Sequence, residues 1–111
     1  MLVVEDDLPS SNALRLLLRH RGYEVLQSTT LADAMGKIDG SLFAIVLDLM
    51  LPDGDGGKLL EQIRRRQLPI KVLVTTGVND GDQITRLKNF APNRLLRKPI
   101  NLADLLRGLS E

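Results

Sequence analysis

Acidic side chains that could bind a metal ion and accept a phosphoryl group follow two apolar segments of the sequence. Glu5 and Asp6 come directly after residues 2–4, and Asp48 ends the apolar run 44–47. Neighbouring carboxylates repel one another unless solvent or a cation neutralises them. Mg²⁺ takes oxygen ligands and often completes its shell with phosphate oxygens. The acids therefore predict a magnesium site, and Asp48 is a candidate nucleophile because aspartate can form an acyl phosphate.

Two further polar side chains, Thr75 and Lys98, follow later apolar segments. A threonine hydroxyl can donate a hydrogen bond to a phosphoryl oxygen, and a lysine ammonium is a compact positive charge suited to the same oxygens. Phosphoryl transfer requires mainly positioning and charge neutralisation. A carboxylate, a divalent cation, a hydroxyl and an ammonium would supply both, provided that the fold brings them together.

Apolar and amphipathic segments alternate five times along the chain, which predicts an α/β fold. Strands are expected at residues 2–4, 23–26, 44–47, 72–74 and 94–97. Helices are expected from Pro9 to Gly22, Thr30 to Asp39 and Leu59 to Arg66, over residues 80–90, and from Asn101 to Leu109. This order predicts a doubly wound parallel sheet with right-handed crossovers. All strand carboxyl ends then share one edge, where the polar side chains would meet.

Local signals place several helix ends. Thr30 with Asp33 three residues later resembles a capping box, and Asn101 is suited to cap the last helix. The run 64–66 consists of three arginines, which suit the negative end of a helix dipole and are expected to face solvent. The segment 80–90 is the most polar of the five, so we expect the least tightly held helix there.

Composition restricts the classes of protein to consider. The 111 residues suit one domain, 1–111, and 15 Lys and Arg against 14 Asp and Glu give a net charge of +1. This balance does not favour nucleic acid or a membrane surface as a partner. The absence of cysteine excludes disulfides and thiolate metal sites. We expect a cytoplasmic protein, and no DNA binding by this chain, since it ends after the fifth expected helix.

Four motifs together resemble the receiver domain of two-component response regulators over essentially the whole chain. They are Val3–Asp7, Leu47–Pro52 with Asp55–Gly56, Val74–Thr75 and Lys98–Pro99. Each motif is weak alone, but four in this order and spacing are specific. The resemblance implies the flavodoxin-like, chemotaxis-regulator-like fold: a five-stranded parallel sheet in the order 2-1-3-4-5 with five helices.

The resemblance also implies a role for the acidic residues. Asp48 would be the phosphoacceptor. Glu5 and Asp6 would bind Mg²⁺ together with Asp48 and the backbone carbonyl of Met50. Asp7 is an extra acid that many members carry, and we do not expect it to be a ligand.

The remaining motif residues match the switch of the family. Thr75 would turn its hydroxyl toward the phosphoryl group, Lys98 would pair with the phosphate, and the Lys98–Pro99 peptide bond is expected to be cis. Leu95 stands where members usually have Tyr or Phe, so the aromatic half of the usual switch is absent. Thr76 stands where a smaller residue is common, and we expect it to narrow access for donors or for the water that hydrolyses the acyl phosphate.

By this resemblance the chain is a signalling phosphoacceptor that catalyses only its own phosphorylation and dephosphorylation. Its partners would be a sensor histidine kinase or histidine phosphotransfer protein and an effector that the sequence does not identify, with a dimer on phosphorylation left open. The main alternative is a receiver-like interaction module that works without phosphate, which Leu95 favours and the complete set of site residues disfavours. An aspartyl hydrolase is less consistent, because such enzymes resemble Asp-x-Asp-x-Thr, whereas Asp48 is followed by Leu49, Met50 and Leu51.

Overall fold

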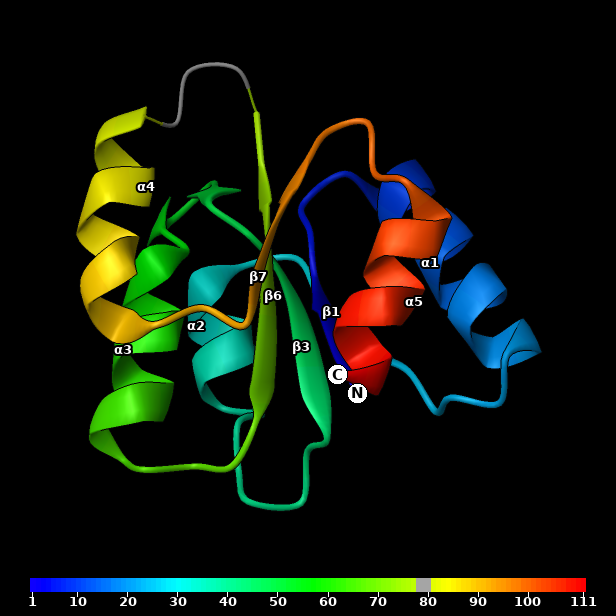
Figure 1. Cartoon of the computed structure of the whole chain (residues 1–111), viewed down its shortest axis with the longest axis horizontal. Coiled ribbons are helices and arrows are strands. Elements are labelled where there is room, and N and C mark those ends of the chain that lie inside the picture. The colour runs from blue at the N-terminus through cyan, green and yellow to red at the C-terminus, as the bar shows by residue number, and fades with distance from the viewer. Residues whose placement is uncertain (78–80) are drawn as a thin grey trace.

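The computed structural model describes residues 1–77 and 81–111 and shows a parallel sheet between two layers of helices (Figure 1). The strands of this sheet are β1 (Leu2–Val4), β2 (Leu26–Ser28), β3 (Ala44–Asp48), β6 (Lys71–Thr76) and β7 (Arg94–Arg97). They lie in the order β2-β1-β3-β6-β7, and every pair is parallel. Counted within this sheet alone, the order is 2-1-3-4-5, and the predicted flavodoxin-like fold is confirmed.

The helices divide between the two faces of the sheet (Figure 1). One face is covered by α1 (Leu8–His20) and α5 (Leu102–Ser110). The other is covered by α2 (Leu31–Met35), α3 (Gly57–Arg65) and α4 (Gly81–Leu87), which continues into a 3-10 turn at Lys88–Phe90. None of the helices in the described part of the chain is long and apolar enough to span a membrane.

Alternation along the central strands builds a separate core on each face. Val46 and Leu73 pack in the cluster under α1 and α5, whereas Leu47 and Val74 pack in the cluster under α2, α3 and α4. Successive side chains of a strand point to opposite faces, so each strand serves both cores. All five residues of β3 are buried, as expected for a central parallel strand.

The expected position of the second strand was wrong. The structure has β2 at Leu26–Ser28, whereas the sequence pattern predicted 23–26. Its three residues pair in register with the three residues of β1, so the short partner strand sets its bounds. Tyr23 and Val25 instead pack as half-buried side chains against the core under α1 and α5, which explains their apolar character.

The second helix is shorter than predicted and its capping box is incomplete. Thr30 caps α2 by accepting a hydrogen bond from the Asp33 N–H at 3.1 Å, as expected. The Asp33 side chain accepts from the Ser28 hydroxyl (2.6 Å) and from Lys37 (2.8 Å), and so ties α2 to β2. The helix ends at Met35 with Gly36 as its C-cap, before the predicted end at Asp39.

The fourth helix has the thin apolar face that its sequence predicts. Residue 80, its expected start, lies outside the described residues. Within Gly81–Leu87 the buried side chain is Leu87, and Ile84 and Phe90 are partly buried against the core.

Arg64 corrects the expectation that the arginines ending α3 simply face solvent. Its guanidinium donates to the carbonyl oxygens of Phe90, Ile70 and Ala91, each at 3.1 Å, and to Asn93 Oδ1 at 2.8 Å. Asn93 Oδ1 also accepts from the N–H of Val72 at 2.8 Å. Arg64 therefore fastens the end of α3 to the segment that leads from α4 into β7.

Candidate functional site

Strand alternation brings the four predicted polar side chains to the same side of the sheet's carboxyl edge. The side chains concerned are those of Glu5, Asp48, Thr75 and Lys98. The residues two positions before each of them all belong to the hydrophobic cluster under α1 and α5: Val3, Val46, Leu73 and Leu96. Because side chains repeat on one face every two residues, the polar groups continue that face beyond the apolar core. Asp48 and Thr75 are also direct neighbours in the β3–β6 register.

Three carboxylates gather at this edge. Glu5, Asp6 and Asp48 each place an oxygen so that the three atoms lie within 4.8 Å of one another. Glu5 and Asp48 are only 6% and 4% exposed, while Asp6 is exposed. Buried carboxylates are costly unless a positive charge neutralises them. Three oxygen donors, two of them buried and one open to solvent, therefore fit a hard divalent cation such as Mg²⁺.

Lys98 supplies positive charge to the same cluster. Its Nζ lies 3.0 Å from Asp48 Oδ2 and 3.2 Å from Glu5 Oε2. Burial by itself lowers the pKa of Lys98, but the hydrogen bond and charge of Asp48, helped by Glu5, raise it above its ordinary value. Lys98 is therefore an ammonium at neutral pH. The Lys98–Pro99 peptide bond that follows it is cis.

Glu5 and Asp7 have different environments although they are two residues apart. Burial, followed by the charge of Asp48, raises the pKa of Glu5 above its ordinary value, against the opposing effects of the Asp7 N–H and of Lys98. The Asp7 side chain instead caps α1, where it accepts from the Ser10 N–H at 3.1 Å. Asp7 thus serves a helix end and lies outside the carboxylate cluster.

Among the residues that the structure describes, the hydroxyl of Thr75 makes only a long hydrogen bond. Thr75 is 2% exposed, and its Oγ1 donates to the Leu47 carbonyl oxygen at 3.5 Å. That distance is beyond the usual range for an O–H···O hydrogen bond. The hydroxyl is thus weakly held beside the Asp48 carboxylate. Thr76, the next residue, is also buried and is paired in register with Arg97 on β7.

The turn after β3 contacts the Asp48 carboxylate directly. The Met50 N–H donates to Asp48 Oδ1 at 3.1 Å, and the Met50 side chain is 62% exposed. Met50–Leu51 (β4) pairs with Gly54–Asp55 (β5) in a small antiparallel hairpin, which the sequence analysis did not predict. Gly56 closes the turn: a Cβ there would lie 2.2 Å from the Asp48 carbonyl oxygen, so no larger residue fits without displacing the backbone.

Asp53, to which the sequence analysis assigned no role, fastens this hairpin to α2. Its carboxylate accepts hydrogen bonds from the N–H groups of Leu31 (2.7 Å) and Ala32 (2.9 Å) at the start of the helix. These bonds hold the pKa of Asp53 below its ordinary value. No local sequence signal marks this contact, because Asp53 lies 22 residues after Leu31.

A hollow of about 320 Å³ borders the site beside α1. Glu5 and Lys98 form its polar end. Its other walls are mostly apolar and include Ala13, Leu14, Leu17 and Ile100. Leu17 is 45% exposed, so the rim of the site offers apolar surface to a visiting molecule.

The sequence model described as response regulator receiver domain matches residues 1–110 of this chain. The swarming motility regulation protein RssB of Serratia marcescens is 32% identical over 107 residues, covering 96% of this chain and 49% of that protein. The chain spans about half the length of the curated relatives it matches, with 50%, 49% and 42% of three of them covered.

Solved structures agree with the sequence comparisons. A response regulator receiver domain protein (CheY-like) from Methanospirillum hungatei has a TM-score of 0.89 and 28% identity, covering 98% of this chain and 88% of that chain. A response regulator protein from Burkholderia pseudomallei, solved with a phosphorylated aspartic acid, a calcium ion and citrate, has a TM-score of 0.83 and 27% identity, covering 97% of this chain and 64% of that chain.

Proposed function

The chain belongs to the response regulator receiver domain family, whose members are signalling domains, and from this premise we propose that Asp48 accepts a phosphoryl group from phosphohistidine. The observation that carries the proposal is the environment of the Asp48 carboxylate. It is buried at the sheet edge, contacts the Lys98 ammonium, and lies with two other acids that suit Mg²⁺. The phosphorylated aspartic acid in the Burkholderia pseudomallei protein supports the same chemistry.

The transfer needs one bond to form and one to break. A carboxylate oxygen of Asp48 attacks phosphorus, and the N–P bond of the donor breaks as its electrons return to the imidazole. Lys98, which now pairs with Asp48 and Glu5, pairs with phosphoryl oxygens in the product. The weakly held hydroxyl of Thr75 turns to donate to another of them. Mg²⁺ bound by Glu5, Asp6 and Asp48, with the carbonyl of Met50, would neutralise charge on the transferred group.

Hydrolysis returns the domain to its starting state. Water attacks the phosphorus of the acyl phosphate, inorganic phosphate leaves, and the Asp48 carboxylate forms again. Thr76, beside Thr75, is buried, and we propose that it narrows the approach of this water and of small donors. We propose that its bulk lengthens the lifetime of the phosphorylated form.

The donor is a sensor histidine kinase or a histidine phosphotransfer protein, and the apolar hollow beside α1 suits its approach because it opens directly beside Lys98. Relatives such as VxrB of Vibrio cholerae are transcriptional regulatory proteins, which supports an effector role downstream. The surface that changes is formed by α4, β7 and α5. Leu95 on β7 is 38% exposed and cannot supply the aromatic half of the usual switch.

Phosphorylation by a small donor tests this function. The wild type with Mg²⁺ and acetyl phosphate should gain the mass of one phosphoryl group in an intact-mass spectrum, and Asp48→Ala should gain none. A wild type that binds Mg²⁺ but takes no phosphoryl group from acetyl phosphate or from a phosphohistidine protein would contradict the proposal. That result would favour the phosphate-independent interaction module instead.

A further inference from the structure

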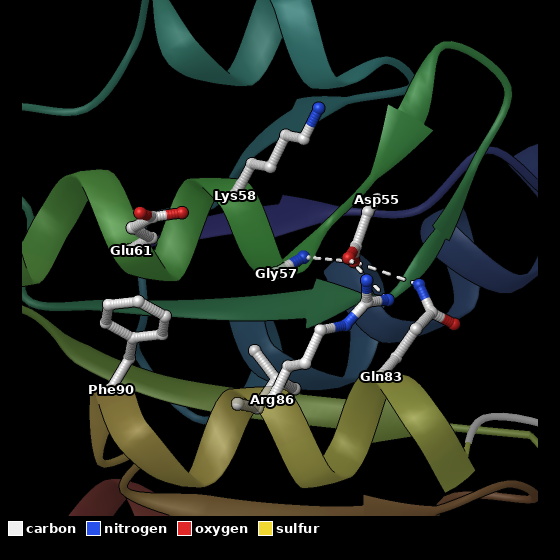
Figure 2. A pocket seen from close by; sticks show the side chains of 8 residues that line it. Asp55, Gly57, Lys58, Glu61, Gln83, Arg86 and Phe90 are labelled. Carbon is white, nitrogen blue, oxygen red and sulfur yellow. Dashed lines mark hydrogen bonds and ion pairs between the residues drawn. The ribbon is translucent and has the colours of Figure 1, made fainter.

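The turn after Asp48 is joined to α4 by the side chain of Asp55 (Figure 2). Asp55 Oδ1 accepts hydrogen bonds from the Gly57 N–H at 2.8 Å and from Gln83 Nε2 at 2.9 Å. Arg86 Nη2 approaches Asp55 Oδ2 at 3.4 Å. One carboxylate therefore contacts the start of α3 and two side chains of α4.

The same residues line a pocket of about 160 Å³ between α3 and α4 (Figure 2). Its two acids are paired within the chain: Asp55 with Arg86, and Glu61 with Arg65 at 2.8 Å. The Asp55–Arg86 pair joins the turn to α4, whereas the Glu61–Arg65 pair lies within α3. We therefore assign Asp55 to the joining of the turn and α4, and not to a ligand.

Gly57 and Leu87 form the apolar part of this junction. A Cβ at Gly57 would lie 2.9 Å from Leu87 Cδ2 and 3.1 Å from Asp55 Oδ1. Leu87 is 3% exposed and is the buried residue of α4 among those described. The position of α4 therefore depends on Leu87, on the partly buried Ile84 and Phe90, and on the polar contacts of Asp55.

The turn that carries Asp55 is closely packed on the backbone of Asp48. The Gly56 N–H donates to the Leu49 carbonyl oxygen at 2.8 Å, and Gln83 Nε2 lies 3.5 Å from that same oxygen. At Gly56 the approach to the Asp48 carbonyl is too close for a Cβ. A displacement of the backbone at Asp48 or Leu49 would thus reach Asp55 and Gln83 without an intervening flexible segment.

We propose that Asp55 and Gln83 are positioning residues that transmit the phosphorylation of Asp48 to α4. The inference rests on the proposed function and adds a route for its readout. When the phosphoryl group changes the charge and the contacts of Asp48, the turn shifts, and the Asp55–Gln83 hydrogen bond moves α4 with it. This route does not use the side chain at position 95, where the chain has Leu95.

Backbone amide chemical shifts of α4, recorded with Mg²⁺ before and after acetyl phosphate is added, test the link. Intact mass measured in parallel gives the phosphorylated fraction. Gln83→Leu removes the donor with little change in volume. Thr85→Ala is the matched control, because within the described part of the chain the Thr85 hydroxyl bonds only inside α4, to Gly81 O at 3.0 Å. At equal phosphorylated fractions, the α4 shift changes should persist in Thr85→Ala and fall several-fold in Gln83→Leu.

A substitution that keeps a donor at position 83 separates positioning from simple structural support. Gln83→Glu places two carboxylates against each other and should suppress the α4 response. Gln83→Lys instead keeps an N–H donor that can reach the Asp55 carboxylate. Gln83→Lys should therefore keep the response that Gln83→Glu and Gln83→Leu lose.

A response of wild-type size in Gln83→Leu would overturn the inference, and so would a Gln83→Lys variant that loses the response. A phosphorylated wild type whose α4 amides do not respond would overturn the inference alone. A wild type that takes no phosphoryl group would overturn the proposed function, and the inference with it.

Discussion

The carboxyl edge of the sheet and helix α4 are held in place in opposite ways. Asp48 ends β3 and Thr75 is the last residue but one of β6, and almost all residues of these two central strands are buried between the two cores. Helix α4 contributes Leu87 as its buried residue among those described, and polar contacts with Asp55 supply much of the rest. Regions with few buried apolar contacts open or shift at lower free energy. The chain thus places its chemistry on the firmly held edge and offers α4 as the part that can respond.

The ion pairs at the carboxyl edge are also less exposed to solvent than the ion pair on α4. At the edge, Lys98 pairs with carboxylates whose side chains are only 8% and 5% exposed. On α4, the Arg86 side chain that pairs with Asp55 is 68% exposed. Exposed ion pairs contribute little free energy because solvent screens them. Among the described polar contacts between α4 and Asp55, the Gln83–Asp55 hydrogen bond therefore contributes most.

The largest expected effect comes from removing the acids that suit the metal. Glu5→Gln combined with Asp6→Asn should reduce phosphorylation by acetyl phosphate to the level of the wild type in EDTA, because Asp48 alone cannot hold Mg²⁺. Intact mass followed over time measures this. Asp82→Asn, which changes an exposed acid of α4, should label like the wild type. Undiminished labelling of the double variant would show that phosphorylation of Asp48 does not require Glu5 and Asp6.

Lys98→Ala should allow phosphorylation of Asp48 but prevent the response of α4. Without the ammonium the phosphoryl group still forms at a measurable rate, but the contact that draws the site into its phosphorylated arrangement is lost. Amide shifts of α4 should then change little at a phosphorylated fraction that gives a full response in the wild type. A full α4 response in this variant would exclude Lys98 from the switch.

Arg64→Ala should weaken the attachment of the segment between α4 and β7 without changing the chemistry. It removes four hydrogen bonds from one guanidinium, and the free energy of unfolding should fall by about 2–3 kcal/mol. Arg65→Ala, which removes an exposed pair with Glu61, should cost only about 0.3–0.5 kcal/mol. Urea denaturation of the two variants and the wild type measures these losses in the free energy of unfolding. Equal losses in the two variants would show that Arg64 does not fasten this segment.

The smallest effect is the pH dependence of the hairpin's attachment to α2. Because N–H groups of Ala32 and Leu31 lower the pKa of Asp53 in the folded chain, its contribution to stability is fully present above the ordinary Asp pKa of about 3.9. The contribution is lost as the pH falls through the lowered folded pKa. The difference in Tm between the wild type and Asp53→Asn should therefore shrink below about pH 4. A difference that does not change with pH would contradict this.

The sheet and the site edge could be predicted because both depend on patterns within single segments. An apolar run buried on both faces indicates a central strand, and the residue that ends it falls at the carboxyl edge whatever its neighbours are. Asp48 and Lys98 could therefore be placed together, although they are 50 residues apart in sequence. Strand alternation then determined which face each side chain joins.

The residues that fasten one element to another could not be predicted in the same way. Asp53 contacts Leu31, 22 residues earlier, and Asp55 contacts Gln83, 28 residues later. In the sequence each is an acid in a Gly-rich turn, a position equally suited to an exposed side chain. Arg64 likewise looks like a solvated helix end until the backbone carbonyls around it are placed. Such contacts follow from the packing of the elements and not from their local patterns.

The central claim, that Asp48 is the phosphoacceptor, can be tested at the level of a single residue. Borohydride reduces an aspartyl acyl phosphate to homoserine, so the wild type treated with Mg²⁺ and acetyl phosphate can be trapped, digested and sequenced by mass spectrometry. The account predicts homoserine at position 48 alone, and none when acetyl phosphate is omitted. Homoserine at another position, or a stable phosphoryl adduct that leaves residue 48 as Asp, would contradict it.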